Sequence, residues 1–91
     1  MIGEDWRTRA ARMGRTTARL REGHMPDVRV WSTREVRVTR DPCITCGEPL
    51  DTGPEAVEVF TVDGVRLLFH LECHDMWVAY RARTGRPGRH R

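Results

Sequence analysis

Apolar and polar positions are most regularly arranged in the second half of the chain, where two short apolar segments, 57–62 and 65–69, flank Asp63 and Gly64. An Asp-Gly pair between two apolar segments is typical of a tight β-hairpin, because Asp and Gly tolerate the positive φ angles that a two-residue turn requires. The pattern therefore predicts an antiparallel hairpin over residues 57–69.

The register of this hairpin decides which side chains share a face. If the residues on either side of the turn pair with each other, Phe60 and Leu67 lie on one face of the sheet. Val59 and Leu68 then lie on the other face. Both faces would be apolar, so we expect the helix after the hairpin to cover one face and the N-terminal segment to cover the other.

The segment after the hairpin, residues 70–83, has the periodicity of a helix. Four side chains recur at the spacing of one helical face: Cys73, Met76, Trp77 and Tyr80. The glycine and proline that follow end the pattern. We expect Trp77 and Tyr80 to be structural. They should pack on the hairpin face that carries Val59 and Leu68.

A second helix is predicted over residues 6–21, a segment with six arginines and no acidic residue. Its apolar stripe is sparse and consists of Trp6, Ala10, Met13 and Leu20. Gly14 and the pair Thr16-Thr17 weaken the pattern, because Gly and β-branched Thr are poor helix formers.

Between this helix and the hairpin, two segments, 28–31 and 36–39, alternate β-branched with polar residues. They predict two short strands. The tetrapeptide 32–35 between them, Ser-Thr-Arg-Glu, fits either a hairpin loop or the N-terminal capping box of a helix. The β-branched residues that follow favour the loop.

Composition places the chain among small proteins that need help to form a stable core. It has 91 residues, of which 38% are hydrophobic and 32% charged, and a domain of this size buries a modest part of its surface. No apolar run reaches the roughly 20 residues of a membrane span, and the N-terminus lacks the pattern of a secretory signal. We therefore expect a cytoplasmic protein. Its odd number of cysteines, three, fits a metal site better than disulfides.

The net charge of +3 conceals a division along the chain. Residues 1–40 hold ten Arg and five acidic residues, residues 41–80 one Arg and eight acidic residues, and residues 81–91 five Arg and no acidic residue. Two basic arms thus flank an acidic middle, and Arg binds phosphate through paired hydrogen bonds. The arms supply the predicted nucleic-acid contacts: Arg7, Arg9, Arg12, Arg15, Arg19, Arg81, Arg83, Arg86, Arg89 and Arg91.

Candidate metal ligands lie in two pairs of equal spacing, C-x2-C at Cys43 and Cys46 and H-x2-C at His70 and Cys73. Two intervening residues let both side chains of a pair reach one tetrahedral ion, the first pair from a tight turn and the second from the first turn of a helix. The hairpin between them brings the pairs together. Three thiolates and one imidazole favour Zn²⁺ among the common metals, so we expect one zinc ion on these four residues.

Three other interpretations of these residues are open. They could be ordinary core cysteines with a chance histidine, or Cys43 and Cys46 could form a redox-active C-x-x-C pair, although no βαβ pattern surrounds it. His70 and His74 could also bind the metal as an H-x3-H pair and leave Cys73 outside. Because position 74 points about 100° away from position 73 on a helix, we expect that His74 is not a ligand.

The order of a C-x2-C-G knuckle, a hairpin and a helix with two ligands resembles a treble-clef zinc finger over residues 41–83. The H-x2-C pair makes it similar to the first zinc half of a LIM domain and to the finger of poly(ADP-ribose) polymerases. The resemblance implies that the zinc ligands are Cys43, Cys46, His70 and Cys73. It implies a small α+β fold of the single-zinc treble-clef type, with an N-terminal helix and short strands added, but it does not specify a function.

We divide the chain into a basic N-terminal segment (1–27), a zinc-binding domain (28–83) and a basic flexible tail (84–91). The predicted function is that of a small zinc-stabilised protein that binds nucleic acid, in the first place DNA, through its arginine-rich arms. The tail sequence Gly-Arg-Pro is similar to the core of an AT-hook, although an ordinary solvated tail has the same composition.

The alternative function is that of a protein–protein adaptor, in which the acidic zinc finger receives a basic partner. An enzyme is not expected, because a closed four-ligand zinc site leaves no open position for water. The sequence specifies neither the identity of a partner nor the oligomeric state.

Overall fold

The computed structural model describes residues 6–23, 25 and 27–84, which form two α-helices, a three-stranded antiparallel sheet and one 3₁₀ turn. The elements in chain order are α1 (Trp6–Glu22), β1 (Val30–Val36), η1 (Leu50–Thr52), β2 (Ala56–Thr61), β3 (Arg66–His70) and α2 (Leu71–Thr84). This is the predicted α+β class, and both predicted helices are present within one residue of their predicted ends. Neither helix in the described ranges is long and apolar enough to cross a membrane.

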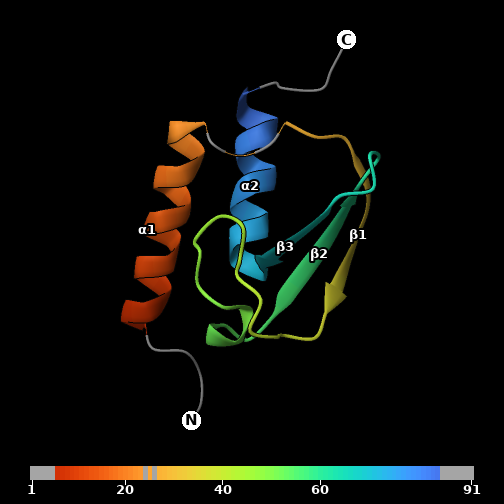
Figure 1. Cartoon of the computed structure of the whole chain (residues 1–91). Coiled ribbons are helices and arrows are strands. Elements are labelled where there is room, and N and C mark those ends of the chain that lie inside the picture. The colour runs from red at the N-terminus through yellow and green to blue at the C-terminus, as the bar shows by residue number, and fades with distance from the viewer. Residues whose placement is uncertain (1–5, 24, 26, 85–91) are drawn as a thin grey trace.

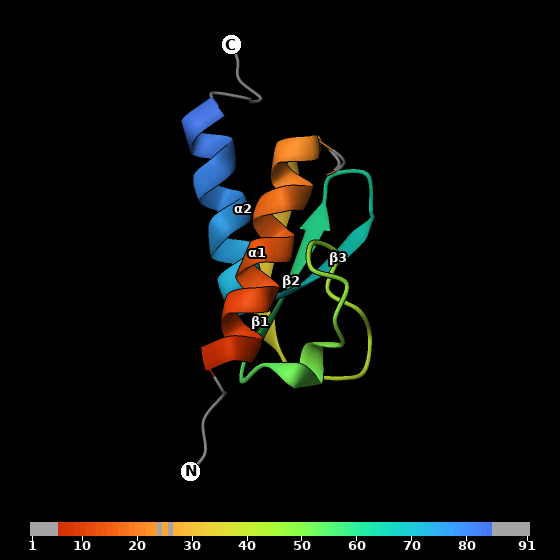
Figure 2. The same cartoon turned by 90° about the vertical axis from the view of Figure 1, so that its left-hand side faces the viewer.

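The elements are arranged in layers, with α2 between α1 and the sheet (Figure 1). α1 and α2 run side by side in the same direction, so their C-terminal ends lie at the same end of the molecule (Figures 1 and 2). The strand order is β1-β2-β3, and α2 packs on β2 and β3. α1 packs on α2. The expectation that the N-terminal segment covers the second face of the hairpin is therefore wrong.

The turn between β2 and β3 is closed by Thr61 and Val65 and encloses three residues, which shifts the register of the strands by one residue from the predicted one. The backbone N–H of Thr61 donates to the carbonyl of Val65 at 2.9 Å, and Gly64 takes a φ of 87°. The loop is one residue longer than the two-residue turn that we predicted. Such a shift moves the side chains of a strand to the opposite face, so Val59 pairs with Leu67 and the predicted pairing is wrong.

The observed register makes one face of the hairpin apolar and the other mixed. The apolar face packs on α2, and its buried side chains are Val57, Val59, Leu67 and Phe69. The mixed face carries Glu58, Phe60 and Arg66, and Phe60 is 40% exposed. Because only one face is apolar, a single helix is enough to cover it.

Residues 30–36 form one continuous strand, where we predicted two strands joined by a loop or a capping box at 32–35. β1 pairs antiparallel with β2, with Thr33 opposite Val59, and a register shift lies near its start. The strand is exposed at every position except Val36, which is half-buried. An edge strand in this position tolerates polar residues, so pairing with β2 overrides the local preference for a loop.

The buried side of α1 differs from the apolar stripe that we predicted. Arg12, Thr16 and Leu20 are at most 5% exposed, whereas Trp6 is 70% exposed. These three buried residues follow one another at intervals of four and form one face of the helix. Two of the three are polar, so a search for apolar periodicity could not find this face.

Trp77 is structural, as predicted. Its side chain is 2% exposed and its ring stacks on Phe69 with 5.0 Å between the ring centroids. Of the two residues predicted to mark the face under Trp77, Val59 lies on the same face as Phe69, as predicted, whereas Leu68 lies on the opposite face of the sheet. Tyr80 is half-buried and lines a hollow between the helices together with Leu20.

Candidate metal centre

The first two candidate ligands lie in a tight turn between β1 and η1. The backbone N–H of Gly47 closes this turn by donating to the carbonyl of Cys43 at 2.9 Å, and Gly47 takes a φ of 82°. The N–H of Glu48 donates to the Cys46 sulfur at 3.5 Å. A further backbone hydrogen bond, from Ile44, holds the turn on the outer edge of β3. The turn therefore presents two sulfur atoms from a position that the sheet supports.

The other two candidate ligands lie where β3 passes into α2. His70 is the last residue of β3 and pairs with Ala56, and Cys73 lies in the first turn of α2. We predicted His70 as the first residue of the helix, but its pairing with β2 keeps it in the strand. The N–H of Leu71 donates to the carbonyl of Glu55 at 3.0 Å, which fixes the point where the strand ends and the helix begins.

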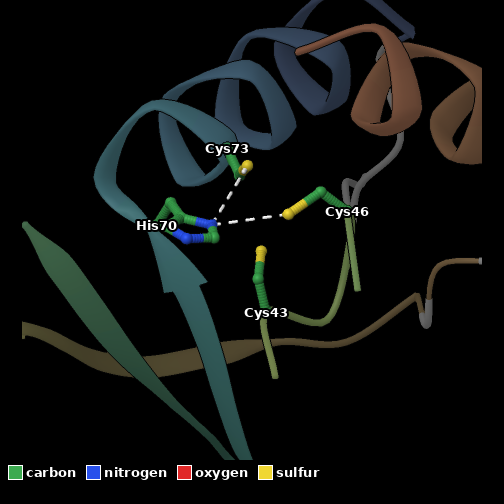
Figure 3. Close-up of side chains that lie close together, drawn as sticks. All are labelled: Cys43, Cys46, His70 and Cys73. Carbon is green, nitrogen blue, oxygen red and sulfur yellow. Dashed lines mark hydrogen bonds between the residues drawn. The ribbon is translucent and has the colours of Figure 1, made fainter. Parts of the chain in front are cut away.

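The four side chains meet in the interior of the molecule (Figure 3). Their ligand atoms all lie within 4.8 Å of one another, and all four residues are at most 6% exposed. His70 Nδ1 lies 3.4 Å from Cys46 Sγ and 3.9 Å from Cys73 Sγ. Donor atoms around a tetrahedral zinc ion are roughly 3.3–3.8 Å apart, given bond lengths of about 2.0–2.3 Å. The cluster can therefore hold one metal ion.

The ring of His70 is oriented by two contacts on its far side. Its Nε2 lies 3.0 Å from the carbonyl oxygen of Pro49 and 3.1 Å from Thr52 Oγ1. A carbonyl oxygen can only accept a hydrogen bond, so Nε2 carries a proton and donates. In the neutral ring this leaves the lone pair on Nδ1, the nitrogen that faces the sulfur atoms.

The cluster attracts positive charge. Burial by itself lowers the pKa of His70, but hydrogen bonds and charge interactions with the sulfurs of Cys43 and Cys73 outweigh burial and raise this pKa to about 9. The hydrogen bond between Cys46 and Cys43 lowers the pKa of Cys43 and raises that of Cys46. The cluster therefore stabilises both a thiolate and a cation beside it, and at such a site a metal cation competes with protons.

His74 lies outside this cluster. Its ring meets the ring of Phe69 edge-on at 5.5 Å, and its Nδ1 is 3.6 Å from an oxygen of Asp75. Within the described part of the chain, His74 does not belong to the group of side chains that could hold a metal ion. The geometry therefore lends no support to the H-x3-H alternative.

Two threonine hydroxyls also contact the cluster, and the sequence analysis missed both. Thr45 Oγ1 lies 3.3 Å from Cys43 Sγ, and Thr16 of α1 donates to Cys73 Sγ at 3.1 Å. The position of Thr45 between the two cysteines of the knuckle was a signal that could have identified it. Thr16 had no such signal, because only the packing of α1 brings it to the site.

The N-terminal arm is partly neutralised by the acidic segment. Arg9 and Arg12 both pair with Glu72, Arg12 at 3.0 Å, and Arg15 pairs with Glu48 at 3.0 Å. Arg12 is 1% exposed, so a phosphate cannot reach its guanidinium, and we correct the prediction by removing it from the nucleic-acid contacts. Arg9 and Arg15 are about half-exposed. Exposed pairs of this kind contribute about 0–1 kcal/mol each and can be exchanged for another anion.

The C-terminal arm divides into structural and exposed arginines. Arg81 lies over the Trp77 ring at 4.7 Å and donates to the carbonyl of Val28 at 2.6 Å, which anchors the segment before β1 to α2. Arg83 is exposed beside Tyr80. The other predicted contacts of this arm lie outside the described residues: Arg86, Arg89 and Arg91.

Two further arginines of the N-terminal arm are exposed on α1. Arg7 lies in the first turn, with its guanidinium 5.4 Å from the ring centre of Trp6. Arg19 lies in the last turn, as does Arg21, which the sequence analysis did not select. The structure thus adds Arg21 to the candidate contacts.

Comparison with known proteins identifies no relative of this chain. No protein-family model, curated protein or solved structure matches it. The residues and the geometry of the site therefore carry the functional argument.

Proposed function

We propose that Cys43, Cys46, His70 and Cys73 bind one Zn²⁺ and that residues 41–83 form a zinc finger of the treble-clef type. The donor set, the spacing of the donor atoms and the orientation of the His70 ring support this proposal. The order of knuckle, hairpin β2–β3 and helix α2 is also that of the family the sequence resembles. Four protein ligands close the coordination sphere, so we infer a structural ion and a binding protein, and no enzymatic role.

We further propose that the protein binds nucleic acid at the end of the molecule where α1 and α2 finish. The observation that carries this proposal is the parallel direction of the two helices (Figure 1). It brings the last turns of the two helices, which belong to different basic arms far apart in the sequence, to one end of the molecule. These turns contain Arg19 and Arg21 in α1 and Arg81 and Arg83 in α2.

Exposure and charge favour this end over the start of α1. Arg19, Arg21 and Arg83 are exposed. The hollow of about 300 Å³ between the helices is lined by Arg21 and Arg83, and none of its described lining residues is acidic. Two arginines nearer the start of α1 are instead paired with carboxylates. A phosphate backbone could contact several of the exposed guanidinium groups at once.

The test compares duplex DNA binding over a series of salt concentrations. Replacing two arginines, Arg21→Gln with Arg83→Gln, should weaken binding and reduce the slope of log K against log salt by about 0.9 for each lost phosphate contact. The matched control replaces two exposed arginines that follow β1 at the other end, Arg37→Gln with Arg40→Gln. Equal zinc content in all proteins shows that each is folded. Equal salt slopes in the two variants would contradict the proposed surface.

The alternative role as a protein adaptor is supported by a different observation. Five large apolar side chains on β1 and the β2–β3 hairpin are exposed: Val30, Trp31, Phe60, Val62 and Val65. Three carboxylates of the acidic segment are already paired with arginines, those of Glu48, Glu58 and Glu72. A protein partner would therefore meet an apolar surface as well as an acidic one. Absence of duplex binding even at low salt would favour this role.

A further inference from the structure

The buried face of α1 is unusual because two of its three residues are polar. Arg12 and Thr16 are 1% and 0% exposed, and Leu20 supplies the apolar part. A helix that docks through its hydrophobic face buries apolar residues here, and a buried polar group needs a specific partner to offset its desolvation. The partners of Arg12 and Thr16 therefore identify the part of the molecule on which α1 docks.

Both partners belong to the first turn of α2, at the candidate metal centre. Arg12 pairs with Glu72 at 3.0 Å, and Thr16 donates to the sulfur of the next residue, Cys73, at 3.1 Å. Neither contact depends on the sheet. α1 is thus attached to the helical turn that carries the candidate ligand Cys73 and the carboxylate of Glu72.

The hydroxyl of Thr16 also connects to a second candidate ligand. Thr16 Oγ1 lies 3.0 Å from Thr45 Oγ1, which in turn lies 3.3 Å from Cys43 Sγ. All four residues are buried. The two hydroxyls therefore form a link of three close contacts between Cys73 in α2 and Cys43 in the knuckle.

The number of protons on this link limits how it can be arranged. Each hydroxyl has one proton to donate, and a thiolate sulfur can only accept. Thr16 donates to Cys73, so Thr45 donates either to Cys43 or to Thr16. In both arrangements Cys73 accepts the hydrogen bond of Thr16, and a hydrogen bond to a charged acceptor is stronger than one to a neutral acceptor. The hydrogen bond from Thr16 is therefore strongest when Cys73 is a metal-bound thiolate.

We propose that Thr16 is a positioning residue of the metal centre, and that through its bond to Cys73 metal binding and the docking of α1 stabilise each other. This inference rests on the zinc site proposed above. Three thiolates around Zn²⁺ leave the centre with a net negative charge, so a hydroxyl donor from α1 stabilises it. The coupling is reciprocal, because each event raises the affinity for the other by the same factor.

The consequence is that the centre holds an arginine-bearing helix in place. α1 carries Arg19 and Arg21 in its last turn, and Arg21 lines one hollow with Arg83 of α2 only when α1 is docked. Loss of the ion frees Cys73, the residue to which Thr16 donates, and so loosens α1. The arginines in the last turns of the two helices are then no longer held together at one end of the molecule.

The first test measures zinc affinity of the full chain by competition with a chromophoric chelator. Thr16→Val keeps the shape of the side chain and removes the donor, so we expect a 10- to 100-fold loss of affinity, on the order found for partners of metal ligands. The matched control is Thr17→Val, because the Thr17 hydroxyl donates to the carbonyl of Met13 in its own helix. Thr16→Ser restores the hydroxyl and should restore the affinity.

The second test measures hydrogen exchange of the α1 amides in the full chain with and without zinc. Zinc should slow exchange in α1 of the wild type, and less so in Thr16→Val. If Thr16→Val does not fold, Thr45→Val tests the same link from the knuckle and should also lower the zinc affinity.

The outcomes separate this inference from the proposed zinc site. If the wild type holds no zinc, both are wrong. If the wild type binds one equivalent and Thr16→Val binds as tightly as Thr17→Val, only the inference is overturned. The inference is also overturned if zinc leaves the exchange of the α1 amides unchanged.

Discussion

The orientation of His70 is constrained by contacts on two sides of its ring. Pro49 and Thr52 fix Nε2 on one side. On another side, a Cβ added at Gly53 would lie 2.7 Å from His70 Cδ2 and 3.6 Å from Arg12 Cζ. The φ of Gly53 is −122°, which any residue adopts. Gly53 is therefore required for the close approach of the ring and not for a special backbone angle.

Gly53→Ala should for this reason displace the ring of His70. We expect a loss of about 1–3 kcal/mol in the free energy of unfolding, the usual cost of overpacking, together with weaker zinc binding. Gly14→Ala is the control: a Cβ there meets no atom within 4 Å, and the change inside a helix should add about 0.5–1 kcal/mol. Urea unfolding with excess zinc measures both. A Gly53→Ala variant as stable as the wild type would show that the ring has room to move.

At the scale of elements, one carboxylate connects all three strands. Glu58 of β2 accepts a hydrogen bond from Arg34 of β1 at 2.8 Å and pairs with Arg66 of β3. Its side chain is 6% exposed. The hydrogen bond from Arg34 is the main cause that lowers the pKa of Glu58, against the opposing effect of burial. Ion pairs thus stabilise the mixed face of the sheet, while the apolar face packs on α2.

The lowered pKa of Glu58 predicts a pH-dependent contribution to stability. A carboxyl whose pKa is lower in the folded state than its usual value of about 4.3 stabilises the fold above that pH, and the contribution is lost as the pH falls through the folded-state pKa. Glu58→Gln should therefore be less stable than the wild type at pH 7, and the difference should shrink below about pH 4. Urea unfolding between pH 3 and 7 measures this difference.

The control for this experiment is Glu55→Gln, which changes an exposed carboxylate of the same segment. Release of metal in acid affects the wild type and both variants alike, so the differences between them isolate the carboxyl groups. A stability difference for Glu58→Gln that stays constant down to pH 3 would contradict the assigned role of the ion pairs.

At the scale of the whole molecule, the candidate metal centre brings together parts that are far apart in the sequence. The knuckle follows β1, His70 ends β3, and Cys73 begins α2, while α1 reaches the same place through Thr16. Much of the buried core surrounds these residues, including Leu50, Phe69 and Trp77. A domain of this size has little other burial with which to offset the entropy of folding.

Removal of zinc should therefore unfold residues 41–83 and release α1. We expect a strong chelator to abolish the cooperative thermal transition seen by circular dichroism, and added zinc to restore it, because binding of a structural zinc ion supplies folding free energy. Metal analysis of the purified protein should give one equivalent per chain. A chelated protein with an unchanged spectrum and thermal transition would contradict a structural role for the ion.

The order of the elements and the candidate ligand set could be predicted from the sequence because they depend on residues close together in the chain. The spacing of Cys43 and Cys46, and of His70 and Cys73, follows from the reach of a turn and of a helix. The hairpin was recognisable from its Asp-Gly turn. The two helices and the hairpin accordingly lie where the local pattern predicted them.

The register, the single strand β1 and the buried face of α1 were decided by the tertiary structure. One extra loop residue before Gly64 shifted the register of the hairpin, so that the side chains of one strand face the opposite side from the one predicted. Pairing with β2 extended β1 through the tetrapeptide 32–35, which has no strand pattern. Thr16 is a poor helix former, yet it is fully buried, because the sulfur of Cys73, 57 residues further along the chain, accepts a hydrogen bond from its hydroxyl. Each of these outcomes depends on a partner far away in the sequence. Local propensities differ by a few tenths of a kcal/mol per residue, and such contacts readily outweigh them.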